Sequence, residues 1–244
     1  MIIIPAIDLK GGQCVRLSQG DMDRATVYSE NPAEMAKTWQ GMGAKRIHVV
    51  DLDGAVSGQP KNRDAIIAVV SAVSVPVQLG GGIRDIETIK EYFSCGIDRV
   101  ILGTAAFKDP RFLEKSCRAW PGRIIVGIDA TDGMVCVQGW TEKTAMSVVD
   151  LVKKIEHLPL AAIVFTDIKR DGMLTGPNIE STAQLARSTH IPVIASGGVS
   201  RIEDIEALLT VEEFGVSGVI IGRALYTGNL DLRECIRIAE GKRQ

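Results

Sequence analysis

Val77-Gln-Leu-Gly-Gly-Gly-Ile-Arg84 and Val193-Ile-Ala-Ser-Gly-Gly-Val-Ser200 are two similar stretches of this 244-residue chain. Each is an apolar run that ends in glycines and is followed by an acidic segment typical of a helix. Gly81 and Gly198 lie 117 residues apart, nearly half the length of the chain. The sequence therefore predicts a duplicated unit made of a strand, a glycine turn and a helix.

Each unit continues into a second apolar run with its own glycine, Val100-Ile-Leu-Gly103 and Val219-Ile-Ile-Gly222. A glycine turn between a strand and a helix exposes backbone N–H groups at the positive end of the helix, which favours a phosphate. Two such units half a chain apart predict a ligand with a phosphate at each end.

Eight apolar runs rich in Val and Ile alternate with eight helical segments along the whole chain. Continuous apolar runs indicate parallel strands that are covered on both faces. An open doubly wound sheet would have one glycine crevice instead of two equivalent ones. We therefore expect a single-domain (β/α)8 TIM barrel over residues 1–244 with a two-fold half-barrel repeat. The predicted strands are 2–7, 46–51, 75–79, 99–102, 123–128, 161–165, 191–195 and 218–221, and the helices are 32–41, 62–73, 86–95, 110–120, 144–157, 179–188, 202–210 and 232–239.

Composition excludes several classes of partner. The formal net charge is −2, no long basic run occurs, and no apolar run is long enough for a membrane span, so we expect neither nucleic-acid nor membrane binding. Five scattered cysteines without a CxxC pair predict reduced thiols and a cytoplasmic protein. No metal-ligand cluster or nucleotide motif occurs, so no metal and no cofactor are expected. We expect a monomer, because a barrel of this size buries its own core.

Asp8 and Asp129 end the first and fifth predicted strands. Catalytic residues of such barrels lie at the carboxyl ends of the strands, and strands one and five face each other across the ring. An Asp after a strand often caps the next helix, but here a glycine-containing turn follows each one. We favour a pair of carboxylates that divide acid and base roles.

Three further polar residues fall near this end of the barrel. Thr166 ends the sixth strand and places a hydroxyl near Asp129. Asp171 lies in the loop that follows, where it either contacts the substrate or stiffens the loop through an Asx turn. His48 lies inside the second strand, as barrel filling or as a substrate contact.

Trp140, Arg16 and Arg84 are loop candidates for binding. Trp140 could stack on a planar ring or anchor the packing of its loop. Arg16 and Arg84 could each meet a phosphate or remain solvated surface charges. The sequence leaves these alternatives open.

An ordered set of motifs resembles the phosphoribosylformimino-aminoimidazole-carboxamide ribotide isomerase family of histidine biosynthesis. The resemblance covers essentially the whole chain. It rests on Ile4-Pro-Ala-Ile-Asp-Leu-Lys10, Val15-Arg-Leu-Ser-Gln-Gly20, His48-Val-Val-Asp-Leu-Asp-Gly-Ala55, Gln78-Leu-Gly-Gly-Gly-Ile-Arg84, Thr166-Asp167, Arg170-Asp-Gly172, Ala195-Ser-Gly-Gly-Val199 and Gly222-Arg-Ala224.

The resemblance implies a cofactor-independent Amadori rearrangement of a bis-phosphorylated aminoaldose to an aminoketose. It implies that Asp129 is the general acid that opens the ribose ring, that Asp8 is the general base at C2, and that Thr166 assists Asp129. It also implies two phosphate sites. The first is the backbone at Gly81, Gly82, Gly103 and Thr104, and the second is the backbone at Gly197, Gly198, Gly222 and Arg223.

Three alternatives remain at this point. The related cyclase that makes imidazole-glycerol phosphate usually has Cys where this chain has Ala6. A bifunctional isomerase that also acts on phosphoribosylanthranilate tends to have an arginine where this chain has Gln138. A non-catalytic phosphate-binding barrel would lack one of the two aspartates. We therefore favour the isomerase with a single activity.

Overall fold

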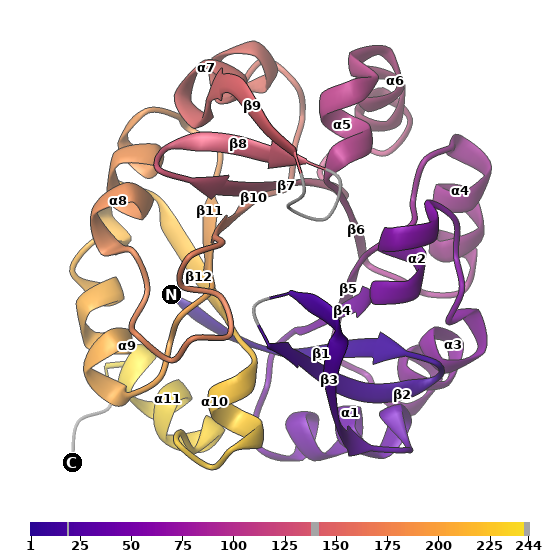
Figure 1. The fold of residues 1–244 in the computed structure, drawn as a ribbon, viewed down its shortest axis with the longest axis vertical. Helices are drawn as coiled ribbons and strands as arrows, with labels where there is room; N and C mark the ends of the chain where they lie inside the picture. Colours follow the sequence, from indigo (N-terminus) through magenta and orange to yellow (C-terminus); the bar gives the residue numbers. More distant parts are fainter. Residues whose placement is uncertain (19, 138–141, 242–244) are drawn as a thin grey trace.

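Short runs of branched apolar residues form the inner ring of the molecule, because helices cover one face of each strand and the barrel interior covers the other. The computed structural model describes residues 1–18, 20–137 and 142–241. In this part of the chain, eight parallel strands close into a ring surrounded by helices (Figure 1), which confirms the predicted (β/α)8 barrel. In ring order they are β1 (Ile2–Lys10), β4 (Ile47–Asp51), β5 (Val77–Gly80), β6 (Arg99–Leu102), β7 (Ile124–Thr131), β10 (Ala162–Asp167), β11 (Val193–Ser196) and β12 (Val216–Ile221).

A helix follows each of these strands on the outside of the ring (Figure 1), close to the predicted ranges. The first begins as the sequence predicts, since the Asn31 side chain accepts a hydrogen bond from the Glu34 N–H at 3.2 Å and Pro32 occupies the first turn. The eight outer helices are α1 (Pro32–Gly41), α3 (Arg63–Ala72), α4 (Ile86–Ser94), α6 (Pro110–Ala119), α7 (Val148–Ile155), α8 (Ile179–Arg187), α9 (Ile202–Leu209) and α11 (Leu232–Ala239).

Two apolar clusters lie on the two sides of the sheet. The larger one packs between the strands and the helices. The smaller one, which includes Ile4, Ala6 and Val164, fills the inside of the barrel. Side chains alternate along a strand. Residues two or four positions after a member of this inner cluster therefore also point into the barrel, at its open end. These positions are Asp8, Gly103, Asp129, Thr166, Ser196 and Gly222.

Two β-hairpins that the sequence analysis missed extend from opposite sides of the ring (Figure 1). One is formed by β1 with β2 (Gln13–Ser18) and β3 (Asp21–Ser29), and the other by β7 with β8 (Met134–Val137) and β9 (Glu142–Ser147). The predicted turns at 11–12 and 132–133 are the two-residue hairpin loops, and all four residues have φ between 52° and 79°. Positive φ at both loop residues matches the twist of paired strands, so these glycine turns make hairpins where loops were expected.

The helix predicted at 144–157 starts too early. Residues 144–147 belong to β9, and the helix α7 begins only after Ser147, whose side chain accepts a hydrogen bond from the Asp150 N–H at 3.1 Å. Short helices were also missed; they are α2 (Leu52–Ser57), α5 (Thr104–Lys108), α10 (Arg223–Tyr226) and the single turn Glu212–Phe214. Within the described ranges, no helix combines the length and the apolar character needed to cross a bilayer.

Candidate active site

The first glycine turn follows β5 at the open end of the barrel. Gly81 and Gly82 have φ of 100° and 73°, in the left-handed region that favours glycine. A β-carbon on Gly81 would lie 2.2 Å from the carbonyl oxygen of Asp51, so a larger residue does not fit. Gly103 and Thr104 follow the neighbouring strand β6, where α5 begins. Gly81, Gly82, Gly103 and Thr104 together form the first cradle.

The second glycine turn repeats this arrangement. Gly197 and Gly198 follow β11 with φ of 91° and 88°, and a β-carbon on Gly198 would lie 2.4 Å from a backbone carbonyl oxygen of the preceding loop. Gly222 and Arg223 follow the neighbouring strand β12, where α10 begins. These four residues form the second cradle. The Arg223 side chain itself donates to the Gly172 carbonyl oxygen at 2.7 Å, so it holds the loop after β10.

The two cradles face each other across the mouth of the barrel. In ring order, β1 and β4 separate them on one side, and β7 and β10 separate them on the other. The sequence predicts two phosphate sites half a chain apart, and the ring places the two glycine cradles of that prediction on opposite sides of one opening. A ligand that reaches both cradles must pass between β1 and β7.

Asp8 extends from β1 into this opening and forms an ion pair with Arg16. The distance from Arg16 Nη1 to Asp8 Oδ2 is 2.6 Å, and the two side chains are only 11% and 17% exposed, respectively. Burial raises the pKa of Asp8 above its usual value, while the charge and the hydrogen bond of Arg16 oppose that rise. Asp8 is thus a carboxylate with increased proton affinity that an arginine holds in place.

Arg16 has a different environment from the one predicted. It lies on β2 in the first hairpin, beside Asp8, with its guanidinium 4.8 Å from the centre of the Tyr226 ring. Arg16 and the Tyr226 hydroxyl both donate to the Ala6 carbonyl oxygen. A β-carbon on Gly222 would lie 2.7 Å from this guanidinium. Arg16 therefore stands between Asp8 and the second cradle, and Tyr226, which the sequence analysis did not single out, supports it.

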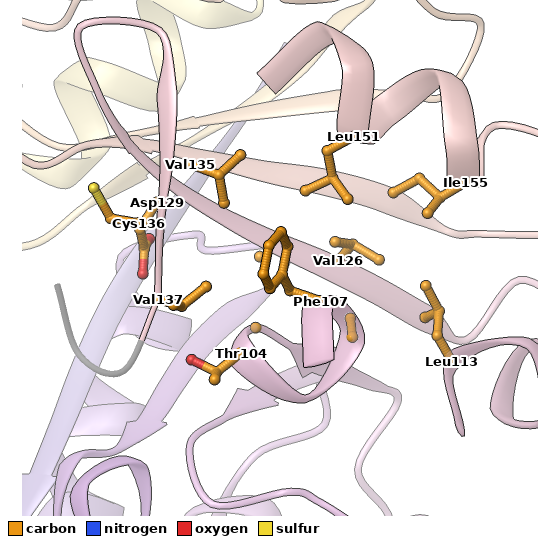
Figure 2. Close-up of a pocket in the computed structure, with 13 residues that line it drawn as sticks. Thr104, Phe107, Leu113, Val126, Asp129, Val135, Cys136, Val137, Leu151 and Ile155 are labelled. Atoms are coloured by element: carbon orange, nitrogen blue, oxygen red, sulfur yellow. The ribbon is translucent and has the colours of Figure 1, made fainter. Parts of the chain in front are cut away.

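Asp129 lies on the opposite side of the opening, on β7. Thr166 is its direct partner in the neighbouring strand β10, and both side chains point inward. Asp129 lines a small cavity together with Thr104, Cys136 and several apolar side chains (Figure 2). Asp129 and Asp8 thus face the same space from opposite strands, as predicted.

Asp171 brings a third carboxyl to the mouth, from the loop after β10. The pKa of Asp171 is raised to about 6, mainly by burial and also by the charges of Asp8 and Asp129, while Arg16 and the Gly172 N–H act in the opposite direction. The sequence analysis left open whether Asp171 contacts the substrate or stiffens the loop. The structure places its carboxyl near enough to Asp8 and Asp129 for their charges to raise its pKa.

The remaining candidates have three different locations. His48 is buried inside the barrel, with 8% exposure, one strand pleat below Asp8. Arg84 is exposed and lies over the loop after β4, where its guanidinium would contact a β-carbon on Gly58. Trp140 lies outside the described residues. In the part of the chain that the structure describes, no group of three or more His, Cys, Asp or Glu side chains is arranged to hold a metal ion.

The loops after β4 and β10, which precede the two cradles in the chain, share a side-chain motif. Asn62 donates its amide to Asp51 at 2.7 Å, and Asn178 donates its amide to Asp167 at the same distance. Each pair spans the loop between a barrel strand and its helix. The half-barrel repeat therefore extends from the backbone to the hydrogen bonds that shape the mouth.

Known proteins similar to this chain cover almost its whole length. The family model described as "Histidine biosynthesis protein" matches residues 2–231. Relatives from Syntrophotalea carbinolica, Trichlorobacter lovleyi and Geobacter sulfurreducens are 57%, 58% and 57% identical over 99%, 98% and 98% of this chain, respectively. These alignments cover 100%, 98% and 98% of the relatives. All three are named 1-(5-phosphoribosyl)-5-((5-phosphoribosylamino)methylideneamino) imidazole-4-carboxamide isomerase.

Proposed function

This chain belongs to the histidine biosynthesis protein family and is an isomerase of that pathway, and we propose that its barrel mouth converts the aminoaldose named in its relatives to the corresponding aminoketose. That compound carries two phosphoribosyl groups. With one phosphate in each cradle, the molecule spans the mouth between β1 and β7. The facing cradles are the observation that carries this proposal.

The rearrangement moves protons and needs no bond to the protein. A general acid protonates the ribose ring oxygen, the ring opens, and a Schiff base forms. A general base then removes the proton from C2, and the resulting enolamine becomes the ketone. Protons given and taken balance over the cycle, as an isomerisation requires. Positioned carboxylates are suited to both transfers.

Asp8 is our candidate for the base at C2. Its raised pKa increases its affinity for a proton, and the ion pair with Arg16 favours the ionised form that a base needs. Asp129, with Thr166 beside it, is our candidate for the acid at the ring oxygen. We propose that Asp171 shares that proton, since a pKa of about 6 leaves it partly protonated near neutral pH.

The test is turnover of the purified chain, alone, on the aminoaldose bisphosphate. The variants are Asp8→Asn, Asp129→Asn and Asp171→Asn, and Asp64→Asn on the exposed side of α3 is the control. Loss of a general acid or base lowers the rate by about 10²-fold or more. We expect this loss at Asp8 and at Asp129 and an unchanged control. Full activity of Asp8→Asn would overturn the assignment of the base.

Two parallel assays separate the related activities. Cyclisation of the ketose with added ammonia, without conversion of the aldose, would identify the cyclase. Rearrangement of phosphoribosylanthranilate by the same sample would identify the bifunctional isomerase. The single-activity prediction rests on Gln138, which lies outside the described residues.

We also propose a cytoplasmic monomer. All five cysteines are free thiols, and four of them are buried, which suits a reducing compartment. The core of the barrel is complete within one chain, since strands and helices of the same chain cover both faces of the sheet. Sedimentation at micromolar concentration should give the 26.3 kDa mass of one chain, and a dimer mass would contradict the monomer.

A further inference from the structure

A polar pair lies inside the barrel, below the carboxylates. His48 on β4 and Gln78 on β5 are direct partners in neighbouring strands, and the Gln78 amide nitrogen is 3.1 Å from His48 Nδ1. Gln78 is completely buried, and its amide oxygen has no hydrogen-bond partner. An unsatisfied buried oxygen destabilises the fold, so the pair needs a reason other than packing.

The second half of the barrel provides a comparison. The residues 116 positions later are Val164 and Ile194, which occupy the same positions in β10 and β11 and are also direct partners. Both belong to the apolar cluster inside the barrel. The same site in the same architecture is thus filled by two apolar side chains. The barrel closes without a polar pair at this position, so the pair in the first half points to chemistry.

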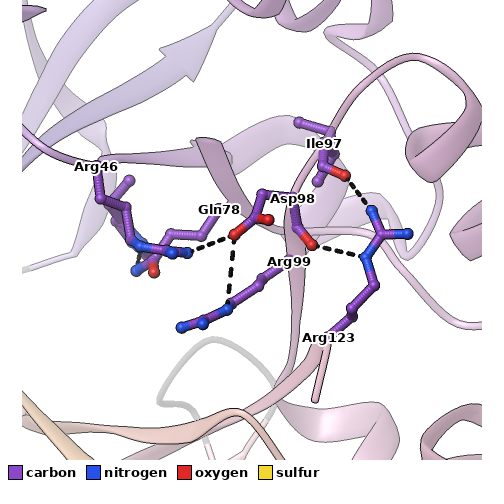
Figure 3. A network of polar contacts seen from close by, with 7 residues as sticks. Arg46, Gln78, Ile97, Asp98, Arg99 and Arg123 are labelled. Carbon is purple, nitrogen blue, oxygen red and sulfur yellow. Dashed lines mark hydrogen bonds and ion pairs between the residues drawn. The ribbon is translucent and has the colours of Figure 1, made fainter. Parts of the chain in front are cut away.

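The hydrogen bonds around Gln78 indicate the orientation of its amide. Gln78 pairs with Arg99 on β6, and Figure 3 shows Arg46 and Arg99 engaged with Asp98, Arg46 through a hydrogen bond of 2.8 Å. The amide nitrogen of Gln78 is the atom 3.1 Å from His48 Nδ1. An amide NH2 can only donate, so it donates to Nδ1. Because Nδ1 accepts, the proton of the neutral imidazole lies on Nε2.

We propose that Gln78 is a positioning residue, which locks His48 in its Nε2–H form so that His48 offers a fixed N–H donor to a sugar oxygen of the substrate next to C2. This role rests on the proposed function. Ala6, the strand partner of His48, lies two residues before Asp8, so the donor lies on the strand next to the base and one level deeper in the barrel. Among the described residues, no group bonds Nε2, and this atom is not fully buried.

His48 stays neutral in this environment. Burial and, to a smaller extent, the nearby Arg16 together lower the pKa of His48 to about 3. The imidazole is therefore a neutral donor over the whole range in which Asp8 works. A protonated His48 would add a positive charge beside Arg16.

The first test reads the tautomer without substrate. The chain has three histidines, and His157 and His190 are exposed, so long-range ¹H–¹⁵N correlations of the ¹⁵N-labelled protein can assign His48 by comparison with a His48→Val variant. We expect an unprotonated Nδ1 and a protonated Nε2, unchanged from pH 6 to 9. A protonated Nδ1 would overturn the proposal, whether or not the protein is an isomerase.

The second test asks what the pair does. Gln78→Glu offers an acceptor to His48 and should move the proton to Nδ1, with a loss in kcat of about 10- to 100-fold, as for other partners that orient a functional histidine. Gln184→Glu on the exposed face of α8 is the matched control and should change neither the spectrum nor the rate. Normal kcat with a moved proton would overturn the proposal.

The third test gives the first half of the barrel the apolar pair that the second half has at the same positions. The double variant His48→Val with Gln78→Ile should keep or raise the melting temperature, because it replaces an unsatisfied polar pair with the apolar pair of β10 and β11. Its kcat should fall at least as far as that of Gln78→Glu. A lower melting temperature with unchanged kcat would show that the pair is structural.

Discussion

Replacing Arg16 with glutamine removes the cation that contacts Asp8 and tests the base directly. The two groups are 2.6 Å apart at their closest atoms, and both side chains are largely buried. Unit charges about 4 Å apart interact by about 4 kcal/mol at an effective dielectric constant of about 20. A carboxyl beside an arginine usually has its pKa lowered by about 1–3 units. We use the range of pKa shifts, because it already includes the screening by solvent that reaches this pair.

The sign of the effect follows from the proposed role of Asp8 as the general base. A base must be ionised, so kcat/KM falls as the pH drops through its pKa. Arg16 lowers that pKa, and its removal therefore moves the acid limb of the profile upward by about 1–3 pH units. At neutral pH the variant should be slow, and at higher pH it should regain much of its activity.

The assay is kcat/KM for the aminoaldose bisphosphate from pH 5 to 10. Arg16→Lys keeps the charge and should keep the limb near its original position, while Arg24→Gln removes an exposed arginine of β3 and should change nothing. An equal loss at every pH in Arg16→Gln, with the limb unmoved, would refute the reasoning. Arg16 would then orient groups without controlling the ionisation of Asp8.

Three further predictions concern stability. Because the pKa of Asp171 is raised to about 6, the folded state loses stability as the pH rises from about 4 through 6. In urea unfolding, Asp171→Asn should therefore be about 1–3 kcal/mol more stable than the wild type at pH 8. At pH 4 the two proteins should have nearly equal stability. Gly81→Ala should destabilise the protein more than Gly122→Ala. At Gly122, with φ of 71°, the backbone conformation costs an alanine about 1–2 kcal/mol but its β-carbon would meet no atom, whereas at Gly81 the β-carbon would also clash with a backbone oxygen. Equal melting temperatures would contradict this. Asp51→Ala should cost about 3–5 kcal/mol by calorimetry, because four buried or partly buried donors lose the same carboxylate, and a loss below 1 kcal/mol would contradict it.

Much of the fold could be predicted from sequence because its signals are local. Strand runs of Val and Ile, N-cap residues such as Asn31, and the spacing of the glycine turns each reflect a short stretch of chain. The two hairpins could have been found, since Gly-Gly and Asp-Gly are typical two-residue hairpin loops. They were missed because β8 and β9 are short and each looks like part of a loop or a helix by itself.

The site was predictable only in outline. The positions of Asp8 and Asp129 follow from strand order, so the sequence places them on facing strands. The ion pair of Asp8 with Arg16 and the support from Tyr226 depend on a hairpin and on a helix 210 residues later than Arg16. The pKa of Asp171 depends on charges from three separate elements. No local pattern contains such contacts.

The half-barrel repeat separates what the scaffold needs from what the chemistry needs. Features present in both halves, such as the Asn62–Asp51 and Asn178–Asp167 hydrogen bonds, shape the loops at the barrel mouth. The halves differ in the surroundings of these two asparagines. In the first half, the hairpin loop is fixed because the Gly12 N–H donates to Asn62 Oδ1 at 2.7 Å; in the second half, the corresponding space beside Asn178 is a cavity of about 340 Å³. Two equivalent glycine cradles are thus combined with asymmetric walls. The proposed reaction needs this asymmetry, because only one of the two sugars would rearrange.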